Sequence, residues 1–128
     1  MNESAEGTTY PDATFVVDPG RVAVFRDLFG IAESVPPTFL TAAEFTVFPA
    51  VIEDPNLALD FTRVVHGSQE YRFERPIVEG ETLTVRARIE SIRRKGAHAF
   101  LVLAMDMIGA DGLLAAVARN TLIERGDA

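Results

Sequence analysis

Glu44 and His66 are the two side chains in this sequence best suited to acid or base chemistry. Glu44 lies within the apolar run Phe39–Phe48, where a carboxylate is costly unless it faces a cavity or a partner. His66 is one of only two histidines, and an imidazole titrates close to neutral pH. Both positions are weak catalytic candidates. We favour a carboxylate at the rim of an interface for Glu44, and a structural histidine that satisfies a backbone carbonyl for His66.

Several other chemistries are excluded by what the sequence lacks. It contains no cysteine, which rules out disulfides, thiolate zinc sites and cysteine nucleophiles. The two histidines are far apart in the sequence and do not make a zinc site. Neither a glycine-rich phosphate loop nor a Gly-x-Ser-x-Gly motif occurs. We therefore expect no metal and no cofactor.

The charge of the chain limits its partners and its location. The formal net charge is -7, which disfavours binding to the phosphate backbone of a nucleic acid. The cluster Arg93-Arg94-Lys95 is a basic exception, and it fits either a solvated hairpin tip or a contact to a phosphate. No apolar stretch is long enough to span a bilayer, and the polar start, residues 1–10, lacks the pattern of a signal peptide. We expect no membrane association and a cytoplasmic location.

Two helices are predicted in the first half of the chain. Asp18 is placed to cap a helix that has Pro19 at its first position and ends at Gly30. A second, long helix is expected to begin near Pro37 and to be buried on most sides, because it is apolar almost all round. Pro49 should end or kink it, since its ring would clash with a carbonyl in the preceding turn.

Strands dominate the second half of the chain. After a short strand at 14–17 and the helices, strands are expected over 63–74, 81–92, 99–108 and 113–124, joined largely by hairpins. The second of these four alternates strictly between apolar and polar residues, and the third is apolar on both faces. The layout is α+β, with an antiparallel sheet that must curl around one central helix to cover it. We expect residues 1–10 to form a disordered tail and residues 11–128 to form a single domain.

Two segments carry a resemblance to a known family. The run VVHGSQEYRFERPIVEGETL over residues 64–83 resembles the "LHGEQ...PLxxGxxL" segment of MaoC-like hydratases and dehydratases. It is similar to the N-terminal half of (R)-specific 2-enoyl-CoA hydratases and to the non-catalytic subunit of two-subunit (R)-3-hydroxyacyl thioester dehydratases. The run VPPTF over residues 35–39 resembles the start of the central helix in the same halves. The likeness extends over roughly residues 14–125.

The resemblance implies a hot-dog fold, with the antiparallel sheet wrapped around the central helix, and a role in acyl-thioester metabolism. The catalytic half of the family carries a Gly-Asp-x-Asn-Pro-x-His signature, and this sequence has none. We therefore expect a partner half that shapes the acyl tunnel, paired with a second hot-dog subunit in a homodimer, a heterodimer or a tetramer. The substrate would be an acyl-ACP or an acyl-CoA in fatty-acid, polyketide or acyl-CoA metabolism. The expected substrate-binding residues are Thr38, Phe39, His66, Gln69 and Arg94.

Two further functions stay open. Some hot-dog thioesterases place a catalytic carboxylate on the central helix, so Glu44 with a water molecule keeps a thioesterase activity in view. A non-catalytic protein that binds acyl thioesters is the third possibility. Backbone amides near Thr38, at the start of the central helix, could stabilise an enolate oxygen in the dehydratase interpretation.

Overall fold

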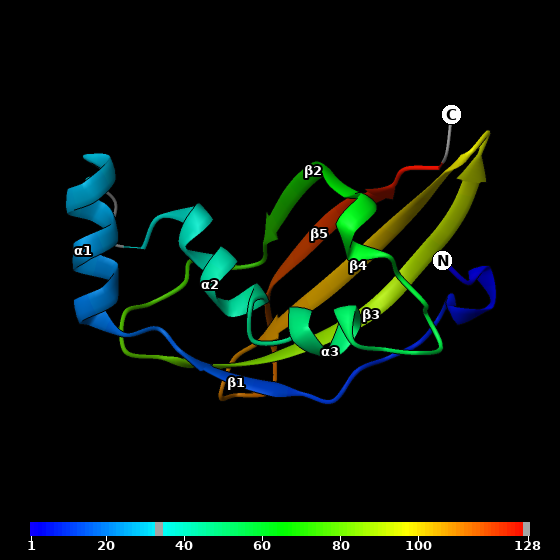
Figure 1. Cartoon of the computed structure of the whole chain (residues 1–128). Coiled ribbons are helices and arrows are strands. Elements are labelled where there is room, and N and C mark those ends of the chain that lie inside the picture. The colour runs from blue at the N-terminus through cyan, green and yellow to red at the C-terminus, as the bar shows by residue number, and fades with distance from the viewer. Residues whose placement is uncertain (33–34, 127–128) are drawn as a thin grey trace.

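Five antiparallel strands form one curved sheet, which carries short helices along one side (Figure 1). The computed structural model describes residues 1–32 and 35–126. The strand order across the sheet is β1-β3-β4-β5-β2. The strands are β1 (Ala13–Val16), β2 (Val64–Phe73), β3 (Thr82–Lys95), β4 (His98–Ile108) and β5 (Leu114–Glu124). The helical segments are η1 (Glu3–Ala5), α1 (Pro19–Phe29), η2 (Pro37–Leu40), α2 (Thr41–Glu44), α3 (Phe48–Ile52) and η3 (Phe61–Arg63).

The long strand β3 confirms the predicted alternation. Leu83, Val85, Ala87 and Ile89 are buried, whereas the residues between them are more exposed, as a half-buried strand requires. The doubly apolar strand β4 lies between β3 and β5 at the centre of the sheet, where both of its edges are hydrogen-bonded. The predicted α+β layout with an antiparallel sheet is therefore present.

The helix α1 begins and ends where the sequence predicts. The Asp18 carboxylate accepts the backbone N–H of Arg21, Pro19 occupies the first turn, and Gly30 closes the helix in the left-handed conformation with φ 63°. A residue with a Cβ would be strained at that φ, which explains the glycine.

The expected long central helix is broken into three pieces, and this part of the prediction is wrong. The segment starts at Pro37 as the 3-10 turn η2, continues as the four-residue helix α2, and resumes as α3 only at Phe48. Pro49 lies in the first turn of α3, because it has no N–H to donate and cannot continue a preceding helix. In the segment between α2 and α3, the Thr46 hydroxyl donates a hydrogen bond to the Ala43 carbonyl at 2.6 Å. Burial is also less complete than expected, since Phe45 is 64% exposed.

The first ten residues are ordered against the sheet, in contrast to the expected disordered tail. The backbone N–H of Gly7 donates to Ile89 at 2.9 Å, and that of Tyr10 donates to Ala87 at 3.0 Å. Ala5 and Tyr10 are buried. The physical reason lies in β3, whose outer edge would expose unpaired backbone groups beyond the end of β1. The N-terminal segment satisfies those groups and extends the edge that β1 begins.

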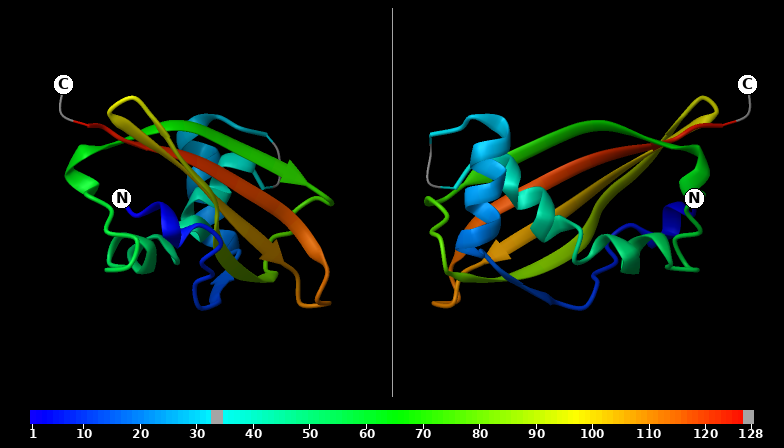
Figure 2. Two further views of the ribbon diagram at one scale, coloured as in Figure 1. Left: turned by 90° about the vertical axis from the view of Figure 1, so that its right-hand side faces the viewer. Right: turned by 60° about the vertical axis from the view of Figure 1, so that its left-hand side comes forward.

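The short helices α2 and α3 lie on one side of the sheet, and the hydrophobic core fills the space between them and the inner face (Figure 2). The opposite face carries ion pairs, among them Arg88 with Asp106 and Arg119 with Glu90. No helix in the described part of the chain has the length and apolar character needed to cross a membrane.

Candidate functional site

The Glu44 carboxylate is fully buried and is held by three side chains. Its Oε1 accepts the Gln69 Nε2 at 2.9 Å and a very close Asn120 Nδ2. Its Oε2 accepts the Tyr71 hydroxyl at 2.7 Å and Gln69 Nε2 at 3.0 Å. A buried carboxylate is stable only when it is hydrogen-bonded in this way. The cluster explains how a charged residue is accommodated in an apolar helix.

Two strands and one helix bring these groups together. Glu44 is the last residue of α2, Gln69 and Tyr71 lie on β2, and Asn120 lies on β5. Gln69 and Asn120 are direct cross-strand partners, so their side chains project side by side from one face. Tyr71 follows two positions after Gln69 and faces the same way.

A β-bulge changes the direction of the side chains just before Gln69. Residues three apart on a regular strand face opposite sides, but the register of β2 against β5 shifts between His66 and Ser68. His66 and Gln69 consequently both line the same cavity. Gly67 occupies the bulge, and a Cβ there would lie 3.2 Å from the Thr121 carbonyl oxygen and 2.9 Å from Ile123 Cδ1.

Tyr71 is a protonated donor in this cluster. Burial raises the pKa of the Tyr71 phenol, the Glu44 carboxylate adds to the rise, and the hydrogen bond with Thr41 opposes it. Because the single phenol proton goes to Glu44, the Thr41 hydroxyl must be the donor in the 2.8 Å contact with the Tyr71 oxygen. The chain of hydrogen bonds Thr41–Tyr71–Glu44 therefore has one direction.

Glu44, Gln69 and Asn120 line a cavity of about 440 Å³. The other lining residues are largely apolar and come from α2, α3, η3 and the two strands. The full lining is Thr41, Glu44, Phe45, Phe48, Pro49, Ile52, Phe61, Val64, His66, Gln69, Asn120 and Leu122. This volume lies within the range of small-molecule sites, which are typically apolar with a few polar groups. The cavity therefore has the mixed lining expected of a site for a largely apolar ligand with a polar group.

His66 differs from the structural histidine that the sequence favours. Its side chain is exposed and lines the cavity. Among the residues that the structure describes, it forms no hydrogen bond or ion pair. The contact to a backbone carbonyl that the sequence favours is not seen among the described residues, and the imidazole borders the cavity instead.

The five expected substrate-binding residues fall in three places. His66 and Gln69 lie in the Glu44 cavity. Thr38 and Phe39 line a separate groove between α1 and α2, and Phe39 is also part of the core. Arg94 lies near the β3–β4 hairpin tip, where it donates to the Met1 carbonyl at 2.7 Å and pairs with Glu3. The structure thus joins Glu44 to two of the five and separates the others.

Sequence reasoning missed Asn120, Tyr71 and Thr41 as members of the cluster. The available signal was Asn120, the one strongly polar residue on the inward face of β5 between Ala118 and Leu122. A buried amide at such a position requires a partner. Glu44 is the one other residue of polar type among those the structure describes as buried, so the pairing was inferable in principle.

Comparison with known proteins gives a match over most of the chain. A family model described as "FAS1-like, dehydratase domain region" matches residues 6–117. The chain belongs to the FAS1-like dehydratase region family. The cavity described above is therefore a feature of a dehydratase-family fold.

Curated relatives of this dehydratase-family chain carry the name UPF0336 protein. A relative from Leifsonia xyli subsp. xyli is 33% identical over 114 residues, covering 89% of this chain and 73% of the relative. A relative from Parafrankia sp. is 39% identical over 112 residues, covering 88% and 71%. The match to the protein from Saccharopolyspora erythraea, 36% identical over 93 residues, covers 73% of this chain and 60% of the relative. The chain thus spans less than two thirds of that relative.

Solved structures of the same shape confirm the predicted hot-dog fold. The HadBC (3R-hydroxyacyl-ACP dehydratase) complex from Mycobacterium tuberculosis contains a chain with TM-score 0.75 and 20% identity, matched over 93% of this chain and 96% of that chain. A MaoC-like dehydratase gives TM-score 0.81 at 16% identity, over 97% of this chain and 43% of that chain. A hot-dog-like protein from Thermanaerovibrio acidaminovorans gives TM-score 0.61 at 19% identity, over 92% and 81%. The dehydratase-family chain has the MaoC-like hot-dog fold.

Proposed function

We propose that this chain is the substrate-tunnel half of an (R)-3-hydroxyacyl thioester dehydratase or enoyl hydratase. It pairs with a second hot-dog subunit that supplies the catalytic acid and base. The substrate is an acyl chain carried as a thioester on an acyl carrier protein or on coenzyme A. Membership in a dehydratase family and the fold shared with a chain of the HadBC (3R-hydroxyacyl-ACP dehydratase) complex support this role.

The proposal rests on the observation that both carboxylate oxygens of Glu44 are already occupied by hydrogen-bond donors. Glu44 is the one acid among the described residues that line the cavity, and both of its oxygens already accept hydrogen bonds. A general base must reach the proton it abstracts with a free lone pair. A water molecule or a substrate proton would have to displace an existing donor, so the cavity favours binding over acid–base chemistry.

The reaction itself is the reversible removal of water across C2 and C3 of the acyl group. The thioester carbonyl acidifies the C2 proton, a base removes that proton, and an acid protonates the departing hydroxyl group. In this proposal the second subunit provides both groups. The apolar wall of this chain, which includes Phe48, Ile52 and Leu122, holds the acyl chain in line with them.

His66 contacts the polar head of the substrate in this scheme. Its imidazole has no partner in the described chain, and it lies in the same cavity as the Gln69 amide. Either group could donate a hydrogen bond to the thioester carbonyl or to the 3-hydroxyl. Such a contact orients the substrate without moving a proton in the rate-limiting step.

Reconstitution tests the proposal directly. The chain is purified alone and together with a hot-dog subunit from the same organism that carries the Gly-Asp-x-Asn-Pro-x-His signature, and hydration of crotonyl-CoA and dodecenoyl-CoA is followed. We expect negligible turnover by the isolated chain and full turnover only in the mixture. His66→Ala in the mixture should raise KM several-fold and leave kcat within a few-fold, because it removes binding shared by ground and transition states.

Three outcomes would contradict this assignment. Robust hydration by the isolated chain would show that an acid–base pair lies within it, with His66 as the first suspect. Steady hydrolysis of acyl-CoA by the folded, isolated chain would favour the Glu44 thioesterase. Binding of acyl thioester with no effect on any partner's turnover would favour a non-catalytic binding protein.

A further inference from the structure

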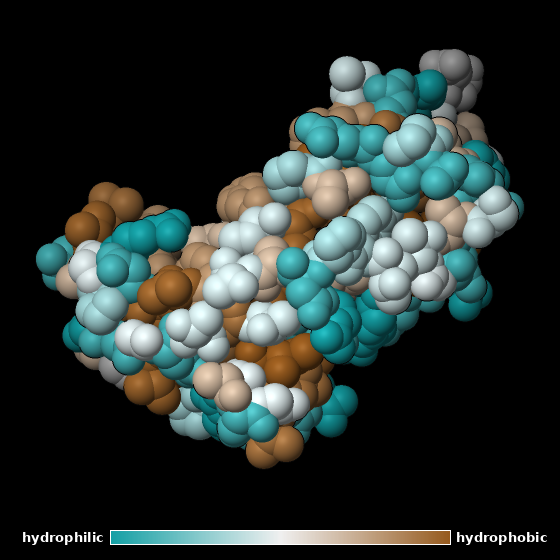
Figure 3. Space-filling model, turned by 90° about the horizontal axis from the view of Figure 1, so that it is seen from below, coloured by the Kyte–Doolittle hydropathy of each residue, from teal (hydrophilic) through white to brown (hydrophobic). Residues whose placement is uncertain are grey.

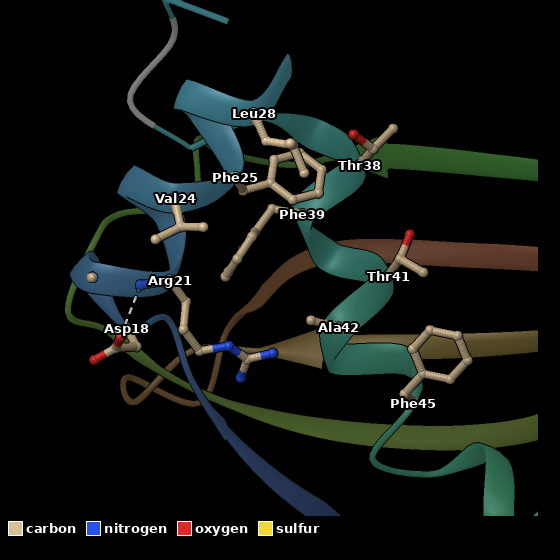
Figure 4. A pocket seen from close by; sticks show the side chains of 11 residues that line it. Asp18, Arg21, Val24, Phe25, Leu28, Thr38, Phe39, Thr41, Ala42 and Phe45 are labelled. Carbon is tan, nitrogen blue, oxygen red and sulfur yellow. Dashed lines mark hydrogen bonds between the residues drawn. The ribbon is translucent and has the colours of Figure 1, made fainter. Parts of the chain in front are cut away.

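A second hollow lies on the other side of α2, between that helix and α1 (Figure 4). It is an open groove of about 560 Å³. Its walls are mainly apolar, with one guanidinium inside. The lining residues are Asp18, Gly20, Arg21, Val24, Phe25, Leu28, Thr38, Phe39, Thr41, Ala42 and Phe45. The groove has a size typical of small-molecule sites.

The apolar side chains of this groove are unusually exposed. Val24 is 67% exposed and Leu28 74%, and they lie one helical turn apart on α1. Phe45, which follows α2 and also lines the groove, is 64% exposed. Seen from below, the end of the molecule where α1 lies shows apolar atoms among hydrophilic ones, whereas the opposite end is mostly hydrophilic (Figure 3). Exposed apolar side chains gathered along a groove indicate that something covers them.

The guanidinium of Arg21 reaches into this groove, and within the described part of the chain it has no acidic partner. It lies 5.7 Å from the centre of the Phe15 ring and 6.0 Å from that of Phe39. Among the residues that the structure describes, no carboxylate forms an ion pair with it. Asp18 caps the helix by accepting the Arg21 backbone N–H, and Figure 4 shows its carboxylate and the guanidinium pointing in opposite directions. A positive charge is therefore left uncompensated in a chain of net charge -7.

The guanidinium of Arg21 forms no hydrogen bond among the residues that the structure describes, so its in-plane N–H donors are open to a ligand. Those in-plane donors match the two oxygens of a carboxylate. The Phe15 and Phe39 rings lie within the range of a cation–π contact and favour a positive charge at this place.

We propose that the groove between α1 and α2 binds a fatty carboxylate, with its carboxylate on Arg21 and its alkyl chain along Val24 and Leu28. The Asp18 carboxylate caps α1 and points away from the guanidinium, so the groove presents one cation and apolar walls, which match a ligand with one negative charge and an apolar tail. A phosphopantetheine arm fits less well, because its amides need hydrogen-bond partners and the groove offers few polar side chains.

The groove and the Glu44 cavity meet at α2, since Thr41 and Phe45 line both. A fatty carboxylate in the groove would therefore lie against α2, the helix that also borders the proposed acyl tunnel. The binding claim does not depend on the dehydratase role, because it is tested on the folded chain without any turnover.

Isothermal titration calorimetry with sodium octanoate and with 1-octanol separates the charge from the tail. The full chain, alone and in complex with its catalytic subunit, should bind octanoate at least about tenfold more tightly than octanol. The reason is that only octanoate can form a charge-assisted hydrogen bond with Arg21. Arg21→Gln should lower octanoate affinity by at least about tenfold and leave octanol binding unchanged. Arg72→Gln is the matched control, because Arg72 is an exposed arginine on β2 outside the groove, and it should change neither affinity.

Other results would overturn the proposal. Equal affinity for octanol and octanoate, or octanoate binding that survives Arg21→Gln, would show that Arg21 does not hold a carboxylate. Displacement of a bound probe by 4′-phosphopantetheine but not by octanoate would assign the groove to a carrier arm. Absence of octanoate binding, together with protection of α1 from hydrogen exchange in the oligomer, would assign the groove to a subunit interface.

Discussion

The two hollows on either side of α2 treat charge in opposite ways. In the cavity, Glu44 is fully buried and accepts hydrogen bonds from three side chains. In the groove, Arg21 is exposed and has aromatic neighbours but no described acidic partner. A buried charge must be compensated by partners within the folded chain. An exposed charge is solvated by water and can stay unpaired until a ligand binds. The comparison predicts that Glu44 serves stability and Arg21 serves binding.

Replacement of Glu44 should produce the largest loss of stability. Glu44→Ala leaves the donors of Gln69, Tyr71 and Asn120 without their shared acceptor. We expect the free energy of unfolding to fall by roughly 2–4 kcal/mol in urea titrations. The control Glu70→Ala removes an exposed carboxylate from β2, the strand that carries Gln69 and Tyr71, and should cost less than about 0.5 kcal/mol. If both variants lose the same small amount of stability, the structural role assigned to Glu44 is contradicted.

Gly67→Ala tests the bulge that turns His66 and Gln69 to the same side. The added Cβ would meet the Thr121 carbonyl oxygen at 3.2 Å, and a backbone atom cannot move aside cheaply. We expect a loss of about 1–3 kcal/mol, the usual cost of overpacking. Ser68→Ala, at the exposed neighbouring position, should be close to neutral by the same urea titration. The account of the bulge fails if the two variants are equally stable.

Alkaline pH should weaken the Glu44 cluster through Tyr71. Its pKa is raised in the folded chain above the usual value of 10.0, so the unfolded chain releases the phenol proton first. The stability that the protonated phenol contributes is fully present below about pH 10 and declines as pH rises beyond it. Tyr71→Phe should flatten this decline in denaturation curves recorded across that range.

Tyr10 supplies the control for the alkaline experiment. It is the other of the two tyrosines, and burial together with Asp54 also raises its pKa. Tyr10→Phe should remove a separate part of the decline, and the double variant should remove most of it. A Tyr71→Phe curve that falls as steeply as the wild type would contradict the assignment of the donor to Tyr71.

Arg21→Gln should have the smallest effect on stability, which sharpens the contrast with Glu44. The lost contacts are the two cation–π interactions with Phe15 and Phe39. Such contacts at exposed sites contribute roughly 0.5–1 kcal/mol, so thermal and urea denaturation should change by no more than about 1 kcal/mol. A loss as large as that of Glu44→Ala would mean that Arg21 is a structural residue.

Local signals in the sequence predicted much of the fold. Asp18, Pro19 and Gly30 define α1 because capping and the left-handed glycine act within a few residues. The strand β3 follows from its alternation. The break in the central helix was harder to predict. The sequence shows that Pro49 must interrupt a helix, but the position of α3 depends on packing. The ordered structure of residues 1–10 could not be predicted from the sequence, because these residues pair with the edge of β3, which is distant in sequence.

The candidate site was predicted in part for the same reason. Glu44 and Gln69 stood out by residue type and by resemblance, and the structure joins them. The contribution of Asn120 depends on cross-strand register, which the sequence does not encode locally. The orientation of His66 depends on a bulge at Gly67, and a regular strand would have placed the imidazole on the face opposite Gln69.

The central claim is that the cavity beside Glu44 holds the acyl chain during turnover. Ile52 lines that cavity on α3, and Ile52→Trp would shorten the space available to a long chain. In the reconstituted complex, the decisive measurement is the ratio of kcat/KM for dodecenoyl-CoA to that for crotonyl-CoA. We predict that this ratio falls at least about tenfold in Ile52→Trp, with crotonyl-CoA turnover kept within a few-fold. An unchanged ratio, in a variant that is folded and assembled, would contradict the account.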